Sequence, residues 1–384
     1  MAQHTVERAV LAALLIALLA SPSHAAVDED EESLYLVAGR CTEFGQRCIF
    51  TRKDNPLPPV EEPTAKPGLA FVSLGDWGCG AGNCDTKHDP NHEQAGNTQM
   101  KVAEVMAKVA ADVDSSLVLA LGDNFYFQGV DSPYDPLWHT VWQSRFNQPS
   151  LQTPWFACLG NHDHYGNAQA QIDFSHLAID RRWILPNYYW TTSRPVGDTG
   201  ATIQFVFIDT VILDTGYTRQ ILREKIEEGV LAPQALHDFN GRTAGWVHAE
   251  VEQLQWLEET LAGSTADWLV VLGHYPVFSG GEHGSTPSLI NTVKPLLEKY
   301  NVDAYFAGHD HTLQHLEDSG VAYYVNGNGC LRGVVKPLTD RTLFAAVDPG
   351  FMLTQVDADT MVNTMIDDGG RAVYQHTLQR KRNL

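Results

Sequence analysis

The side chains best suited to chemistry follow five short apolar runs, each of which ends in a glycine and a metal-competent residue. The stretch Gly122-Asp123-Asn124-Phe125-Tyr126 follows the apolar run 117–121, so a carboxylate and a phenol lie three residues apart. A carboxylate can bridge two metal ions, and a phenolate is a hard oxygen donor that suits a ferric ion. The spacing therefore indicates a metal site that favours iron.

Four other stretches repeat this construction. Apolar runs without polar alternation are typical of strands buried on both faces, and ligands of open α/β sheets collect beyond the carboxyl ends of such strands. Five strand ends can thus converge on one site, and together they predict a dinuclear metal centre. The four further stretches are Gly75-Asp76-Trp77-Gly78, Gly160-Asn161-His162-Asp163, Gly273-His274 and Gly308-His309-Asp310-His311.

Each of these histidines, taken alone, is more often a hydrogen-bonded core residue than a ligand. His309 and His311 weaken that interpretation, because alternation along a strand or turn places both imidazoles on one side. Two cations about 3.5–4 Å apart would clamp the oxygens of a phosphoryl group and lower the pKa of bound water.

The five motifs, in this order, resemble those of the metallophosphoesterases. Gly78 stands where many members carry histidine, and the presence of Tyr126 makes the chain similar to the purple acid phosphatases of the small, tartrate-resistant type. The resemblance covers residues 69–380. It implies an α/β fold of four layers, in which two packed mixed β-sheets are flanked by helices.

The resemblance also implies a ligand set for a ferric ion and a divalent partner, which is iron, zinc or manganese in relatives. Asp123 would bridge the two ions. The Fe(III) ligands would be Asp76, Tyr126 and His311, and the M(II) ligands would be Asn161, His274 and His309.

The implied activity is that of an acid phosphatase, which hydrolyses phosphate monoesters by attack of a metal-activated hydroxide. His162 would stabilise charge or donate a proton, steadied by Asp163, and His283 would protonate the leaving group; both histidines would act as imidazolium. The alternatives are a phosphodiesterase of the same superfamily and an exported metal- or ligand-binding protein on a phosphatase scaffold. A redox role of the iron is a further hypothesis.

The composition limits the partners. The 384 residues contain 43% hydrophobic residues, enough for one large α/β domain with appendages, and the formal net charge is −21. This acidic balance argues against nucleic acid, whose backbone needs a basic surface. We expect a small phosphate monoester or a phosphoprotein as substrate, and a monomer.

The first 25 residues predict a signal peptide, with Arg8, the apolar run 9–20 and the small-residue site Ser23-His24-Ala25. We therefore expect a secreted or lysosomal/vacuolar protein, without stable membrane insertion after signal cleavage. Residues 26–68 are predicted to form an acidic, cysteine-containing and proline-rich extension. The catalytic domain is expected to span residues 69–380, and residues 381–384 are expected to form a basic tail. Disulfides are expected for Cys41–Cys48 and Cys79–Cys84, while Cys158 and Cys330 are expected as free thiols, with a third bridge left open.

Hydrophobic periodicity predicts the elements around the site. Residues 217–243 are expected to form a long, partly helical surface loop, and residues 351–378 a meander of three short antiparallel strands. Strand 202–208 and five helices are expected; the helices span 100–112, 136–146, 168–177, 246–261 and 287–300, the last bent at Pro295.

Overall fold

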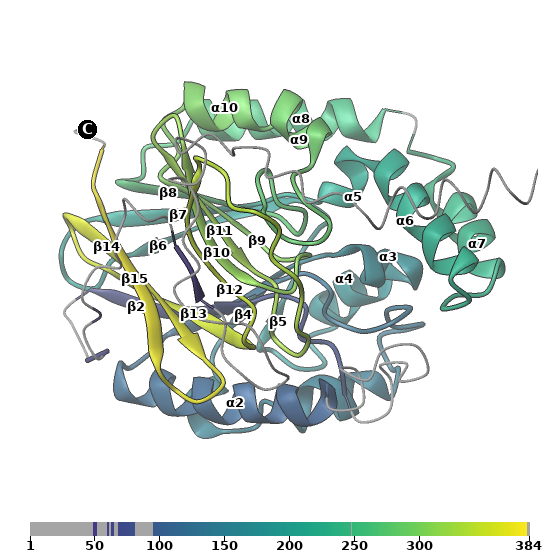
Figure 1. Cartoon of the computed structure of the whole chain (residues 1–384), viewed down its shortest axis with the longest axis horizontal. Helices are drawn as coiled ribbons and strands as arrows, with labels where there is room; N and C mark the ends of the chain where they lie inside the picture. The colour runs from purple at the N-terminus through teal and green to yellow at the C-terminus, as the bar shows by residue number, and fades with distance from the viewer. Residues whose placement is uncertain are drawn as a thin grey trace, which may run out of the picture.

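The protein forms four layers in a computed structural model, which describes residues 49–51, 60, 63–64, 68–80, 95–246 and 248–381. Helix α2 (Ala95–Asp112) covers one side, helices α8 (Ala249–Ala262), α9 (Pro287–Thr292) and α10 (Lys294–Lys299) cover the other, and two β-sheets lie between them (Figure 1). The predicted fold class is confirmed. The predicted signal peptide and most of the extension lie outside the described residues.

The seven-stranded sheet has the order β15-β14-β13-β2-β3-β4-β5. Strands β2 to β5 are parallel, and the last three strands pair antiparallel, as the meander prediction requires. The strands are β2 (Leu69–Leu74), β3 (Leu117–Leu121), β4 (Trp155–Cys158), β5 (Trp183–Ile184), β13 (Gly350–Val356), β14 (Thr360–Asp367) and β15 (Ala372–Gln379).

The eight-stranded sheet has the order β1-β12-β10-β11-β9-β8-β7-β6. Its strand β1 belongs to the predicted extension and pairs with β12, so this part of the extension is joined to the sheet. The strands are β1 (Ile49–Phe50), β6 (Trp190–Pro195), β7 (Thr202–Phe207), β8 (Trp268–Leu272), β9 (Ala304–Ala307), β10 (Leu313–Asp318), β11 (Val321–Asn326) and β12 (Thr342–Ala346).

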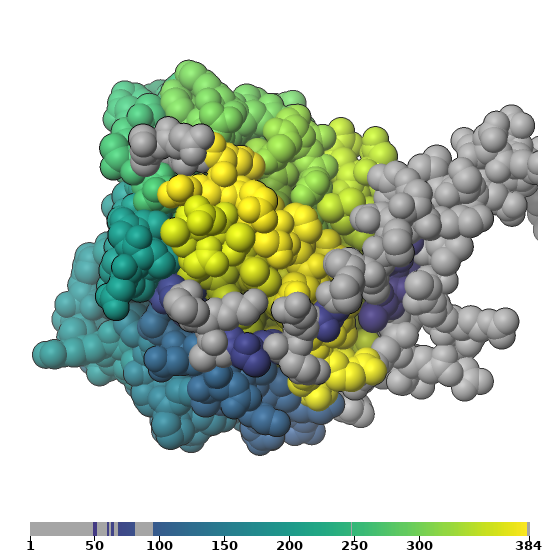
Figure 2. Space-filling model, turned by 90° about the vertical axis from the view of Figure 1, so that its left-hand side faces the viewer, coloured from purple at the N-terminus to yellow at the C-terminus, as the bar shows by residue number. Residues whose placement is uncertain are grey.

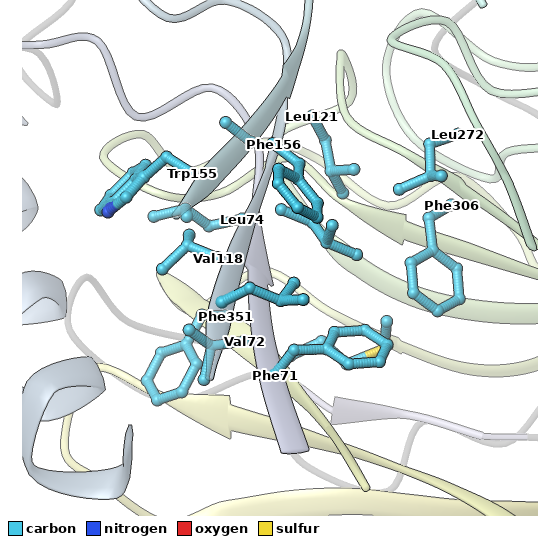
Figure 3. Packing of buried hydrophobic residues seen from close by; sticks show 14 of the residues in the cluster. Phe71, Val72, Leu74, Val118, Leu121, Trp155, Phe156, Leu272, Phe306 and Phe351 are labelled. Atoms are coloured by element: carbon cyan, nitrogen blue, oxygen red, sulfur yellow. The ribbon is translucent and has the colours of Figure 1, made fainter. Parts of the chain in front are cut away.

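The main hydrophobic core contains side chains of both sheets and of α2, and part of it fills the space between the sheets. Figure 3 shows Phe71, Leu121 and Phe156 on one side of this space and Leu272 and Phe306 on the other. All five side chains are at most 1% exposed, and full burial of one such side chain contributes roughly 1.5–3 kcal/mol. The close packing fixes the sheets against each other and therefore fixes the strand ends that carry the site.

Two predicted helices differ from the structure. The segment 287–300 is divided into α9 and α10 rather than bent, because Pro295 lacks the N–H that would continue the hydrogen-bond ladder and lies in the first turn of the new helix. Within 136–146, only the six-residue π-helix η3 (Trp138–Gln143) forms. Helix α4 (Ala168–His176) agrees with its prediction, and η4 (Pro149–Leu151) is a short 3₁₀ turn.

The segment 217–243 is more ordered than predicted. It contains helices α6 (Thr215–Glu227) and α7 (Gln234–Thr243), whose buried Ile221, Leu222 and Phe239 pack into the second core cluster. The expected helical content is therefore confirmed, whereas the expected loop is wrong for most of the segment. Two further short helices are α3 (Asn161–Tyr165) and α5 (Thr210–Leu213). Among the described residues, no helix is both long and apolar enough to cross a membrane.

Candidate metal centre

Five strand ends meet where the two sheets face each other. Strands β2, β3 and β4 run parallel in one sheet, and β8 and β9 run parallel in the other, so their carboxyl ends lie at the same edge of the molecule. The seven residues expected to bind metal follow these ends directly. The structure brings them together in two adjoining groups.

The first group consists of Asp76, Tyr126 and His311. The Tyr126 hydroxyl lies 3.0 Å from Asp76 Oδ1 and 3.2 Å from His311 Nε2. His311 Nε2 lies 3.5 Å from Asp76 Oδ1. Three donor atoms from three strand ends thus face one another closely enough to contact a common atom, as the hypothesis of a ferric site requires.

The second group consists of Asn161, His274 and His309 beside Asp123. His274 Nε2 lies 3.1 Å from Asn161 Oδ1 and 3.3 Å from Asp123 Oδ1. The His309 ring lies 5.2 Å from the His274 ring, centre to centre. One ligand atom each of Asp76, Asp123 and His274 also falls within 4.8 Å of the others, so Asp123 connects the two groups.

Three of these residues adopt a backbone conformation that side chains disfavour. Asp76, Asp123 and His309 have φ values of 55°, 49° and 72°. Each costs on the order of 1–3 kcal/mol and persists where the surrounding structure over-determines it, which is common at functional sites. The chain therefore maintains strain at three of the seven expected ligands.

Aromatic anchors hold the strained turns. Trp77 follows Asp76 and Phe125 precedes Tyr126, and both anchors are fully buried. Trp77 packs edge-on against Trp155 with ring centres 5.6 Å apart, and Phe125 packs against Trp138 at 4.7 Å. Such pairs contribute about 0.5–1.5 kcal/mol beyond area burial, and here they fix the backbone on which the ligands stand.

Glycines permit the close approach of the turns. A Cβ at Gly78 would lie 2.6 Å from the backbone of Asn124, so the histidine that many metallophosphoesterases carry at this position does not fit here. Gly122 has a φ of 87°, and a Cβ there would lie 2.6 Å from His274 Nδ1. Both positions need a residue without a side chain.

The electrostatics of the site fit bound cations. The carboxylates of Asp76 and Asp123 are at most 1% exposed, and their ion pairs within the described chain are with histidines alone. Burial disfavours charge on His274, but Asp123 and Asp76 outweigh it and raise its pKa to about 10. Burial and both carboxylates raise the pKa of the Tyr126 phenol. Positive charge is therefore favoured at this point, and the oxygen and nitrogen donors match iron, zinc or manganese.

The expected proton donors line the same cavity. His162 Nδ1 donates to the Phe127 carbonyl at 2.8 Å, so Nε2 faces the cavity, 3.9 Å from Asp123 Oδ2. His283 stacks on His309 with ring centres 4.3 Å apart, and its backbone N–H donates to Asp310. Burial lowers the pKa of His162 to about 4 and also lowers that of His283, so burial opposes the imidazolium form assigned to both rings. A bound phosphate dianion would favour that form again.

Asp163 supports the site through the backbone. No hydrogen bond joins its carboxylate to the His162 ring within the described structure; it accepts instead from the backbone N–H groups of Gly160, Asn124 and Phe125 and from Gln171 Nε2. These bonds tie the turn after β3 to the turn after β4. Asp163 thus positions the segments that carry Asp123, Tyr126 and Asn161.

Replacing Asp163 with Asn should lower the free energy of unfolding by about 2–4 kcal/mol, because the amide NH₂ would face buried N–H donors and leave them without an acceptor. Urea denaturation measures this change. Asp173→Asn is the matched control, since Asp173 accepts one exposed hydrogen bond on the neighbouring helix α4. Equal stability of both variants would show that the carboxylate of Asp163 does not hold the turns.

The cavity at the site has a volume of about 260 Å³. Sequence reasoning missed three polar residues beside it: Tyr217 shares a hydrogen bond with His309 Nε2 at 3.3 Å, and Lys225 and Arg332 line the cavity. Tyr217, Ile221 and Lys225 recur every four residues, which is one face of a helix. This helical spacing could have identified Tyr217 and Lys225 from the sequence.

The described cysteines have the predicted states, free or disulfide-bonded. Cys158 and Cys330 are free and buried, and Cys79 is disulfide-bonded. The predicted pairings also involve Cys41, Cys48 and Cys84, which lie outside the described residues.

Comparison with known proteins gives a consistent result. Residues 71–313 match the calcineurin-like phosphoesterase family. The chain is 34% identical to tartrate-resistant acid phosphatase type 5 of Oryctolagus cuniculus, over 83% of this chain and 93% of that protein, and 31% identical to purple acid phosphatase 17 of Arabidopsis thaliana, over 76% and 79%.

Two solved structures share the fold. GAP50, described as the anchor in the inner membrane complex of Plasmodium, superimposes with a TM-score of 0.65 at 23% identity, covering 83% of this chain and 90% of that one. The purple acid phosphatase PPD1 of yellow lupin (Lupinus luteus) superimposes with a TM-score of 0.56 at 15% identity, covering 87% and 59%. The sequence relatives carry the assignment, and the chain belongs to the calcineurin-like phosphoesterase family, among its tartrate-resistant and purple acid phosphatases.

Proposed function

We propose that the protein is an acid phosphatase that hydrolyses phosphate monoesters at a dinuclear Fe(III)–M(II) centre. The observation that carries this proposal is the convergence of oxygen and nitrogen donors of seven residues from five strand ends, with five of these residues lining one cavity. The names of the sequence relatives support the activity.

The ligand assignment follows the two groups. Asp76, Tyr126 and His311 would hold the ferric ion, and Asp123 would contribute to both ions. Asn161, His274 and His309 would hold the divalent ion, which is iron, zinc or manganese. The phenol supports iron, because a phenolate is a harder donor than the imidazole that occupies the corresponding place in many metallophosphoesterases.

When bound, two cations lower the pKa of water and neutralise charge on the phosphoryl oxygens. The chain supplies the rest of the machinery. His162 Nε2 faces the cavity and, in the imidazolium form that a bound phosphate dianion favours, can donate a hydrogen bond to a phosphoryl oxygen. His283, stacked on His309, would protonate the departing alkoxide. Lys225 and Arg332 also line the cavity, where Lys225 pairs with Glu228 and Arg332 with Asp348.

The location and substrate class rest on the sequence. A cleaved signal peptide would deliver the protein to the outside or to a lysosomal or vacuolar compartment, where the disulfides expected at Cys41–Cys48 and Cys79–Cys84 persist. A small phosphate monoester or a phosphoprotein side chain is the expected substrate.

The function is tested by comparing the hydrolysis rates of an aryl phosphate monoester and the matching diester. We expect the monoester to react faster by about tenfold or more in kcat/KM, because only the monoester presents a dianion to the cations and to Lys225. A faster diester would support the phosphodiesterase alternative. No turnover of either ester by fully metal-loaded protein would support the binding-protein alternative.

A further inference from the structure

A second cluster of metal-competent side chains lies away from the centre described above. His315 and Glu317 are two residues apart on β10 and therefore project from the same face of that strand. His376 comes from β15 in the other sheet. Glu317 Oε1 lies 3.7 Å from His315 Nε2 and 3.6 Å from His376 Nε2. The three ligand atoms lie within 4.8 Å of one another, and none of these residues lines the catalytic cavity.

One nitrogen of this cluster is buried and has no hydrogen-bond partner among the described residues. His315 is fully buried, and its Nε2 makes no hydrogen bond with any described residue. The carboxylate of Glu317, at 3.7 Å, is beyond hydrogen-bond distance. Buried polar atoms are nearly always satisfied, so a nitrogen that points at a carboxylate and a second imidazole calls for an occupant between them.

The other nitrogens of both rings are held by phenols. His315 Nδ1 shares a hydrogen bond with the Tyr374 hydroxyl at 2.7 Å, and His376 Nδ1 shares one with the Tyr324 hydroxyl at 3.2 Å. The His315 ring also stacks on Tyr324 at 4.5 Å. A hydrogen bond to the second nitrogen is what orients a metal-binding histidine and directs its remaining lone pair to the ion. Here it leaves Nε2 available on both rings.

The charge state of the rings agrees with this role. Burial lowers the pKa of both imidazoles, and the neighbouring His376 lowers that of His315 further; Glu317 opposes the shift of His376. Both rings are therefore mainly neutral near pH 7, which is the form that binds metal.

We propose that His315, Glu317 and His376 form a third metal site, for a divalent cation of the zinc type. Two imidazoles and one carboxylate are a common set of protein ligands for zinc, with a fourth position open to water. Neighbouring ligand atoms of tetrahedral zinc lie about 3.3–3.5 Å apart, close to the distances to Glu317 Oε1. The side chains of Glu317 and His376 are 45% and 26% exposed, which gives a cation access from solvent.

The site would join the two sheets. Strand β10 belongs to the eight-stranded sheet, whereas β15 is the edge strand of the seven-stranded sheet. The terminal hairpin β14–β15 forms much of the face turned toward the viewer in Figure 2. A cation shared by His315 and His376 would hold this hairpin to β10, independently of the catalytic centre.

Zinc binding to protein already loaded at its catalytic centre tests the proposal. The wild type, Glu317→Gln and His376→Gln are dialysed against micromolar Zn²⁺, and bound zinc is measured by elemental analysis. We expect each variant to bind one equivalent less than the wild type, with unchanged turnover of the phosphate monoester. His139→Gln, which removes an exposed histidine from η3, should bind as much zinc as the wild type.

A second variant separates metal binding from folding. Tyr374→Phe keeps the ring that stacks on Phe344 but removes the hydroxyl that orients His315, so zinc affinity at this site should fall by about 10–100-fold. If Glu317→Gln, His376→Gln and Tyr374→Phe all bind zinc with the stoichiometry and affinity of the wild type, the cluster is an ordinary polar contact and the proposal is wrong.

Discussion

Asp123→Asn should lower kcat/KM for a phosphate monoester by about 10³-fold or more. Asp123 connects the two ligand groups: its Oδ1 accepts from the His162 backbone N–H at 2.9 Å and lies 3.3 Å from His274 Nε2. An amide removes the negative charge and one of the two metal-binding oxygens. The electrostatic stabilisation by such a pair of cations amounts to several kcal/mol of the barrier, and about 4 kcal/mol corresponds to this factor.

Steady-state kinetics and metal analysis of the same preparation check the prediction, with fewer than two ions per chain expected in the variant. Asp114→Asn is the matched control, because Asp114 also has a positive φ, of 54°, but lies exposed at the end of α2. Full activity in Asp123→Asn with two bound ions would mean that this carboxylate does not bridge the ions.

His162→Ala should lower kcat by about 10²–10⁴-fold while leaving the metal content unchanged. The ring is fixed by the Phe127 carbonyl and lies between Tyr126 and Tyr165, with ring centres 4.5 and 4.8 Å away. Its Nε2 therefore has a set position beside Asp123, and a positioned proton donor contributes about this factor. Turnover at saturating substrate measures the effect.

The metal content of His162→Ala distinguishes two causes of a lower turnover. Unchanged metal content indicates loss of the proton donor or charge stabiliser, whereas a lower content indicates loss of bound metal. His139→Ala serves as the control for replacing an exposed histidine outside the cavity. Should His162→Ala retain wild-type turnover at saturating substrate, the proton or the charge is supplied by another group, and His283 becomes the first residue to substitute.

Much of the site follows from local sequence. Asp76, Asp123, Asn161, His274 and His309 each come directly after an apolar run and a glycine, so the strand fixes the direction and the glycine permits the turn. Periodicity also gave the end of α2 and both ends of α4 to within one residue, because their buried faces are regular, whereas α2 begins at Ala95, before the predicted start at residue 100.

Other features depend on contacts between distant segments. Helix α6 is buried through Ile221 and Leu222, which join a core cluster built from distant segments, so its otherwise polar sequence resembled a surface loop. Likewise, Asp163 was expected to support the His162 ring, yet its carboxylate joins two backbone turns, and no spacing in the sequence specifies that partner. His315 and His376 are brought together by sheet packing alone.

In the proposed centre, Asp76, Tyr126 and His311 hold a ferric ion, with the Tyr126 phenolate as one of its ligands. The visible absorption spectrum of the iron-loaded protein tests it most directly. A purple phenolate-to-iron absorption is expected in the wild type, and it should be absent from Tyr126→Phe. Persistence of that absorption in Tyr126→Phe, or its absence from iron-loaded wild type, would contradict the proposed centre.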